Sequence, residues 1–309
     1  MHSPAAPPVI VVDGLRKTFG RQRVLDGVSF AVGRGEVFAL LGPNGAGKTT
    51  TINVLTTLVR PDAGTAGVAG FDVTREPEQV KRRISLTGQS AAVDDALTGT
   101  ENLVMLGRLS GLNRRAARAR AAELLERFGL TDAATRRVGA YSGGMRRRLD
   151  LALSFVVAPE VLFLDEPTTG LDTRSRRELW DVIRSLADAG TTVFLTTQYL
   201  EEADQLADRV AVLDGGRVVA GGTAAALKSR IGGDTVEVHD AQGALVREVP
   251  TDGSVSGLRR ALDVLDESGA EGIVTLRRPS LDDVFLAFTS PDGRGAPSAR
   301  HSDTAKELA

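Results

Sequence analysis

The sequence contains no cysteine, so disulfide bonds, thiol catalysis and zinc sites built on thiolates are excluded. Histidine is also scarce, with three in 309 residues, and any metal site must use oxygen or nitrogen ligands. The sequence also lacks a strong excess of either charge. It contains 38 basic and 40 acidic side chains, for a formal net charge of −2. A general nucleic-acid binder usually needs a strong basic excess. We therefore expect no nucleic-acid partner.

No apolar run in the sequence is long enough to cross a bilayer, which takes about 20 residues. The most apolar stretch, LALSFVVAPEVLFL, is interrupted by Pro159 and Glu160. The opening MHSPAAPPVIVVDG lacks the basic region and apolar block of a signal peptide. We therefore expect a cytosolic chain that would take part in any membrane process through a partner.

The chain is long enough for a large core and a smaller appendage, with 42% hydrophobic residues and 34 glycines. Short apolar strands alternate with helical segments up to about residue 222, which predicts an α/β fold with a mostly parallel sheet covered by helices on both faces. The chain is expected to be helical between about residues 100 and 130. The predicted organisation is a flexible segment at 1–8, a main domain at 9–222, a small α+β module at 223–290 and a disordered tail at 291–309.

The segment LLGPNGAGKTT contains the pattern G-x-x-x-x-G-K-[ST] between an apolar strand and a helix. Glycines let successive backbone N–H groups close around phosphate oxygens, and the positive end of the helix dipole adds to this attraction. Lys48 is expected to reach the β and γ phosphates, and the Thr49 hydroxyl to ligate magnesium. The predicted ATP-binding residues of this loop are Gly42, Pro43, Asn44, Gly45, Ala46, Gly47, Lys48, Thr49 and Thr50.

A second segment, VLFLDEP, ends a buried strand with two carboxylates at the sheet edge where ligands collect in parallel folds. Asp165 is expected to hold the magnesium shell. Glu166 points the other way and is expected to act as general base toward the attacking water. The alternative for this pair is a solvated strand end without chemistry.

Four segments in order, the phosphate loop, YSGGM, LFLDEPTTGLD and LTTQYLEEAD, resemble the nucleotide-binding subunit of ATP-binding cassette (ABC) transporters over residues 9–222. The resemblance implies a P-loop NTPase cassette with a helical subdomain, which hydrolyses ATP with Mg²⁺. It also implies a homodimer in which Ser142, Gly143 and Gly144 bind the ATP of the other protomer. Taken alone, Ser-Gly-Gly would be a plain turn at a helix start.

Within this resemblance, four more residues correspond to known positions of the family. Gln89 corresponds to a magnesium-contacting glutamine, Phe19 to an aromatic that stacks on adenine, and Asp172 to a residue that reaches across the dimer. Their alternatives are a solvated side chain, a core aromatic and a helix N-cap, and for Asp172 the N-cap is compatible with the role across the dimer. Gln198 stands where most family members have a histidine; its amide can still donate to the γ phosphate but cannot carry a proton's charge. Gln198 is therefore expected to be a catalytic residue together with Lys48 and Glu166.

A narrower resemblance extends through LDDVFLAF to about residue 289 and includes Gln198: the chain is similar to ATPase subunits of bacterial anthracycline-type drug efflux pumps. It implies a separate integral membrane permease and a peripheral location at the cytoplasmic face of the cell membrane. Export of a lipid or glycan and a soluble role outside transport remain alternatives. The arginine runs RRAARAR and MRRRL are interpreted as solvated helix faces.

Overall fold

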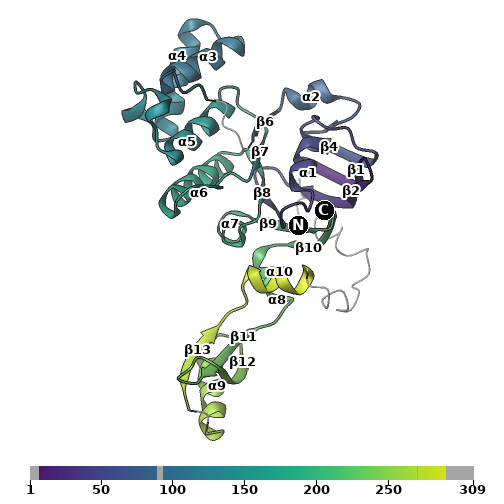
Figure 1. Ribbon diagram of the computed structural model, residues 1–309, viewed down its shortest axis with the longest axis vertical. Helices are drawn as coiled ribbons and strands as arrows, with labels where there is room; N and C mark the ends of the chain where they lie inside the picture. The colour runs from purple at the N-terminus through teal and green to yellow at the C-terminus, as the bar shows by residue number, and fades with distance from the viewer. Residues whose placement is uncertain (1–6, 89–92, 270, 290–309) are drawn as a thin grey trace, which may run out of the picture. The chain divides into compact units, whose positions relative to one another are not determined.

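The computed structural model describes residues 7–88, 93–269 and 271–289 (Figure 1). They form two compact units that divide between Gly221 and Gly222. The predicted disordered tail lies outside the described residues, as does most of the predicted flexible segment at 1–8. Within the described ranges, no helix is long and apolar enough to cross a membrane.

The first unit is built around a six-stranded sheet with strand order β10-β9-β3-β8-β7-β6. The pairs β6–β7, β7–β8, β8–β3 and β3–β9 are parallel, as the sequence predicts. The strands VFALL and VLFLD are buried along their whole length, which is typical of a parallel sheet covered on both faces. The six strands are β3 (Val37–Leu41), β6 (Ile84–Thr87), β7 (Val161–Asp165), β8 (Thr192–Thr197), β9 (Arg209–Asp214) and β10 (Arg217–Gly222).

Helices lie on both faces of this sheet, as predicted, but one face also carries a second sheet that the sequence did not predict. That face is covered by α1 (Lys48–Leu55) and by a separate antiparallel sheet of order β2-β1-β4-β5 (Figure 1). Its first two strands are joined by two residues only, a connection that allows a hairpin but not a parallel crossover. Stacked phenylalanine rings from β2, β3 and β8 fill the space between the two sheets. The antiparallel strands are β1 (Ile10–Phe19), β2 (Gln22–Val32), β4 (Ala63–Val68) and β5 (Phe71–Asp72).

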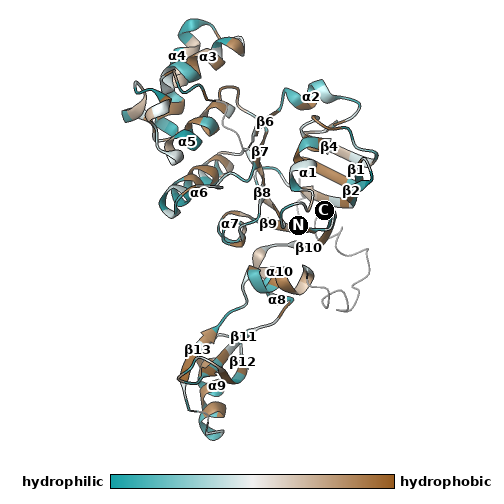
Figure 2. Ribbon diagram, in the orientation of Figure 1, coloured by the Kyte–Doolittle hydropathy of each residue, from teal (hydrophilic) through white to brown (hydrophobic). Residues whose placement is uncertain are grey.

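Two helices cover the other face of the six-stranded sheet (Figure 1). The apolar side of α6 (Thr173–Asp188) packs on the sheet, and its polar side faces outward (Figure 2). These helices are α6 (Thr173–Asp188) and α7 (Leu200–Leu206), and a short α2 (Pro77–Lys81) precedes β6.

A helical subdomain lies between β6 and β7. The region expected to be helical over about 100–130 is helical and consists of two helices, because Gly111 adopts a φ of +92° and Asn113 caps a new helix. The interpretation of MRRRL as a solvated face is wrong, since the side chains of Arg147 and Arg148 are only 12% and 19% exposed. The elements are α3 (Gly99–Leu109), α4 (Arg114–Arg127), the 3₁₀ turns η1 (Thr131–Ala133) and η2 (Val138–Ala140), and α5 (Gly143–Ser154).

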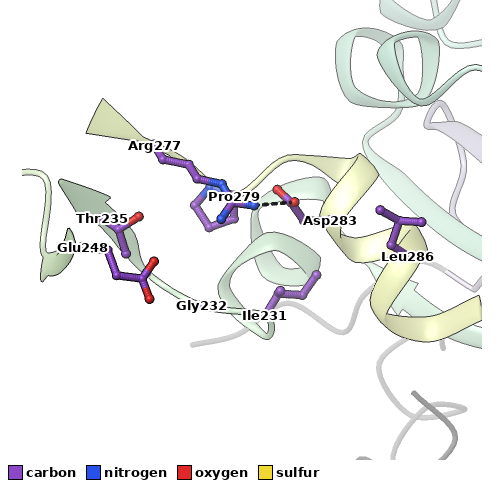
Figure 3. Close-up of a pocket in the computed structure, with 9 residues that line it drawn as sticks. Ile231, Gly232, Thr235, Glu248, Arg277, Pro279, Asp283 and Leu286 are labelled. Atoms are coloured by element: carbon purple, nitrogen blue, oxygen red, sulfur yellow. Dashed lines mark hydrogen bonds and ion pairs between the residues drawn. The ribbon is translucent and has the colours of Figure 1, made fainter. Parts of the chain in front are cut away.

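The second unit contains a three-stranded antiparallel sheet of order β12-β11-β13. Its small core joins Val236 and Val238 of the central strand to Ala261 and Leu265 of α9. A cavity of about 310 Å³ in this unit is lined by Glu248 and by Arg277, which pairs with Asp283 at 2.8 Å (Figure 3). None of the predicted nucleotide-binding residues lines it. The elements are α8 (Ala224–Ser229), β11 (Asp234–His239), β12 (Leu245–Thr251), α9 (Val255–Glu267), β13 (Ile273–Arg277) and α10 (Leu281–Thr289).

Candidate functional site

The candidate site forms where the carboxyl ends of the parallel strands meet. The phosphate loop follows β3, Asp165 ends β7, and Gln198 follows β8 directly. The strand register places Leu41 beside Thr197, and Asp165 beside Thr196. Parallel pairing therefore brings together residues that are more than a hundred positions apart in the sequence. Gln89 lies outside the described residues.

Two glycines of the phosphate loop are required by close approach to the rest of the chain. A Cβ on Gly47, whose φ is +109°, would lie 2.7 Å from Leu25 Cδ2. A Cβ on Gly42 would lie 2.3 Å from the carbonyl oxygen of Leu213. Larger residues at these positions would displace the loop, so its backbone N–H groups are held in place by packing from neighbouring strands.

The ammonium group of Lys48 is held at the loop. Its Nζ donates to the carbonyl oxygens of Gly42 at 2.8 Å and Pro43 at 3.1 Å. The same atom lies 3.2 Å from Glu166 Oε1, and both side chains are largely buried. Two of the predicted catalytic side chains are therefore in direct contact, next to the predicted phosphate cradle.

The predicted magnesium ligands Thr49 and Asp165 also lie together. The Thr49 hydroxyl donates to Asp165 Oδ1 at 3.3 Å, and Thr196 donates to the same oxygen at 2.6 Å. One hydroxyl and one carboxylate fit Mg²⁺, which takes few protein ligands and completes its shell with phosphate oxygens and water. Throughout the described part of the chain, no group of three or more acidic or histidine side chains forms a denser metal site.

Glu166 adopts a left-handed backbone conformation, with a φ of +48°. This conformation is uncommon for a residue other than glycine, and such strain is concentrated at functional sites. Its backbone N–H donates to the carbonyl oxygen and to the hydroxyl of Thr196, each at 3.1 Å. Its side chain lies toward Lys48 and Thr169, whereas Asp165 lies toward Thr49. The two adjacent carboxylates thus have different partners among the described residues: Lys48 and Thr169 for Glu166, Thr49 and Thr196 for Asp165.

Thr196 is a functional residue that the sequence reading missed. It fixes the Asp165 carboxylate and the Glu166 backbone at once through its hydroxyl. The available signal was a pair of threonines at the end of TVFLTT, a strand that is buried along its whole length.

The residues expected to serve the other protomer lie at two helix starts. The Ser142 hydroxyl accepts from the N–H of Met145 at 3.2 Å and caps α5, which begins at Gly143. Asp172 accepts from Ser175 at 2.9 Å and caps α6, so the N-cap alternative for Asp172 is correct. A Cβ on Gly144 would lie 2.6 Å from Ser175 Oγ. Among the interactions of the described residues, no hydrogen bond joins this group to Lys48, Asp165 or Glu166.

The two remaining predicted contacts are placed differently. Phe19 ends β1 and is 48% exposed, with Lys17 Nζ 5.3 Å from its ring centre. The alternative of a core aromatic is therefore wrong. Gln198 is half-buried at the end of β8, between Thr197 and Tyr199, whose N–H donates to the Thr197 hydroxyl at 2.9 Å.

Glu202 on α7 is fully buried, and its Oε1 accepts from Trp180 Nε1 at 3.2 Å. Burial raises the pKa of the Glu202 carboxyl above its ordinary value of 4.5. Hydrogen bonding by Thr197, Thr168 and Trp180 and the positive charge of Arg176 act in the opposite direction but do not cancel the effect of burial. The folded protein then holds a proton at pH values where the unfolded chain has lost it. The protonated Glu202 therefore contributes to the free energy of unfolding. That contribution is fully present below about pH 4.5 and is lost as the pH rises through the raised pKa.

We expect Glu202→Gln to gain free energy of unfolding relative to the wild type as the pH rises from about 4.5 toward neutrality. Glutamine can accept the Trp180 bond without ionising. Urea unfolding at a series of pH values measures the difference, with Glu201→Gln, at an exposed neighbouring position, as the matched control. A difference between Glu202→Gln and wild type that does not change with pH would contradict this expectation.

Comparison with known proteins places these features in one family. Residues 25–169 match the family described as ABC transporter. The chain is 53% identical to the daunorubicin resistance ATP-binding protein DrrA3 of Streptomyces coeruleorubidus, over 94% of this chain and 98% of that protein. It is 40% identical to the Nod factor export ATP-binding protein I of Burkholderia lata, over 91% and 98%. A crystal structure of an ATP-binding cassette in its ADP conformation aligns with a TM-score of 0.65 at 25% identity, over 71% of this chain and 92% of that one.

Proposed function

The chain belongs to the ABC transporter family and hydrolyses ATP, and from this premise we propose that it energises export of an amphiphilic drug through a separate membrane-spanning partner. One observation supports this cargo: the alignment with a drug resistance ATP-binding protein, at 53% identity overall, covers 94% of the chain and so extends into the second unit. The relative named for Nod factor export is less similar. Export of a different cargo, a lipid or glycan, is the second candidate.

Within one copy, the site residues divide the work. The phosphate loop and Lys48 would bind the triphosphate, because backbone N–H groups and a buried cation suit phosphate oxygens. Thr49 and Asp165, with Gln89, would hold Mg²⁺, which supplies charge neutralisation at the phosphates when bound. Glu166 Oε1 or Oε2 would accept the proton of the attacking water. Gln198 would donate its amide hydrogen to the γ phosphate, and Phe19 would stack on the adenine ring.

A second copy would complete each site. Ser142, Gly143 and Gly144 present a helix start, where the dipole and free N–H groups attract phosphate, and Asp172 starts the helix beside them. Two copies related by a two-fold axis would each supply one phosphate loop and one such helix start. In this proposal the homodimer lies at the cytoplasmic face of the membrane and docks on an integral membrane permease. In this proposal residues 9–222 form the ATPase domain and 223–290 an accessory module.

The proposed cargo is tested with the full-length chain purified together with its membrane partner in lipid vesicles. Daunorubicin, as a representative amphiphilic drug, is expected to raise ATP turnover above the drug-free rate. Lipid and glycan probes in the same vesicles are expected not to do so. Stimulation by the lipid or glycan probes alone would replace drug export by the second candidate.

A further inference from the structure

Arg147 reaches from α5 into the interior of the first unit. Its Nε donates to the carbonyl oxygen of Pro167 at 2.8 Å. Its Nη1 donates to the carbonyl oxygen of Gly88 at 2.8 Å and to Asp150 Oδ2 at 3.1 Å. One guanidinium thus joins three parts of the chain: the helix that Ser142 caps, the end of β6 and the loop after β7.

The two backbone acceptors stand beside predicted site residues. Pro167 follows Glu166 directly, and Gly88 directly precedes Gln89. Strands β6 and β7 are parallel neighbours in the sheet, so both carbonyl groups lie beyond the carboxyl ends of these two strands. A guanidinium is a rigid planar fork, and a fork bonded to two carbonyl groups fixes the distance between them. Arg147 therefore holds the position of the peptide that follows Glu166.

The charge of Arg147 is costly to bury and is compensated locally. Burial lowers the pKa of its guanidinium, and Asp150, which is 4% exposed, is the first of the groups that oppose the shift. Arginine nevertheless stays charged in proteins. A buried ion pair is weak evidence for stability, because apolar residues of similar volume pack as well or better. The hydrogen bonds from Arg147 to the carbonyl groups of Pro167 and Gly88 indicate instead that the side chain fixes the backbone at these two residues.

We propose that Arg147 is a positioning residue for ATP hydrolysis, which couples α5 and the Gly88 carbonyl at the end of β6 to the loop that carries Glu166. The proposal rests on the hydrolytic role of Glu166 in the proposed function. A shift of α5 or of the Gly88 carbonyl would move Glu166 through a single side chain. Misplacing a catalytic group by about 1 Å can cost about 10²-fold in rate, so small shifts would be enough to switch turnover.

The test uses two variants of the full-length chain. Arg147→Lys keeps the charge beside Asp150, but an ammonium is a single point donor and cannot serve both carbonyl groups in the fork geometry. The double variant Arg147→Met with Asp150→Leu removes the guanidinium together with the carboxylate that pairs with it. Both are expected to lower kcat about 10- to 100-fold while the Kd for ATP stays within about twofold of wild type. Thermal unfolding of each variant checks that the fold is retained.

The matched control is Arg146→Lys, since Arg146 is the neighbouring arginine and pairs with the exposed Asp95 at 2.8 Å. It is expected to turn over ATP at the wild-type rate. Wild-type kcat in Arg147→Lys would overturn the proposal, because the charge alone would then be sufficient. Glu166→Gln is assayed in parallel: if it were active, the assigned chemistry would fail, whereas an inactive Glu166→Gln beside a fully active Arg147→Lys would refute only the positioning role.

Discussion

Glu166→Gln is expected to lower ATP turnover by about 10²- to 10⁴-fold, the range that a general base contributes. Glutamine has nearly the same shape as glutamate and can still accept a hydrogen bond from Lys48, but its amide does not take a proton from water at neutral pH. The phosphate loop, Lys48 and Thr49 are unchanged, so binding of ATP is expected to persist. Turnover is measured as phosphate release, and binding by equilibrium titration of ATP.

Glu160→Gln is the matched control for this prediction. Glu160 precedes β7, the strand that Glu166 follows, and it pairs with Arg34 and Arg83 at the opposite end of the sheet. The same chemical change is thus made at both ends of one strand. Wild-type turnover in Glu166→Gln would show that Glu166 is not the general base. A loss of turnover in Glu160→Gln as large as in Glu166→Gln would show that the loss does not depend on the position of the carboxylate.

The sequence predicted the part of the site that depends on local geometry. A glycine-rich loop between an apolar strand and a helix has few alternatives, because a Cβ on Gly42 or Gly47 would meet neighbouring strands. The position of Asp165 and Glu166 followed from the end of a continuous apolar strand. The class of the fold followed from the alternation of strands and helices, and the family from the order of the motifs.

The features that the sequence did not predict depend on contacts between distant segments. The antiparallel sheet of β1, β2, β4 and β5 needs β4 to pair beside β1, about 50 positions earlier in the chain, and no local pattern specifies that pairing. The burial of Arg147 depends on carbonyl groups of Gly88 and Pro167, which carry no side-chain signal. Arginine runs are usually solvated, so composition favoured the wrong interpretation of MRRRL.

The proposed sharing of sites between two copies is tested by a complementation experiment. One variant, Lys48→Ala, loses the cation of its own phosphate loop, and another, Ser142→Arg, blocks the helix start proposed to serve the other copy. Each variant alone is expected to have almost no turnover, because both sites of its homodimer carry a defect. In a mixed dimer the two defects fall together in one site and leave the other intact. An equal mixture is therefore expected to recover up to roughly a quarter of wild-type turnover.

The matched control combines Lys48→Ala and Ser142→Arg in one chain and mixes it with Lys48→Ala. No dimer in that mixture has an intact site, so turnover is expected to stay near zero although the same substitutions are present. Ser142→Arg also removes an N-cap, at a cost of about 1 kcal/mol, and thermal unfolding checks that α5 and its subdomain remain folded. If mixing the single variants gave no more turnover than the two alone, the helix start of one copy would not serve the nucleotide of the other. Each chain would then have to complete its own site, with Ser142 acting only as the cap of α5.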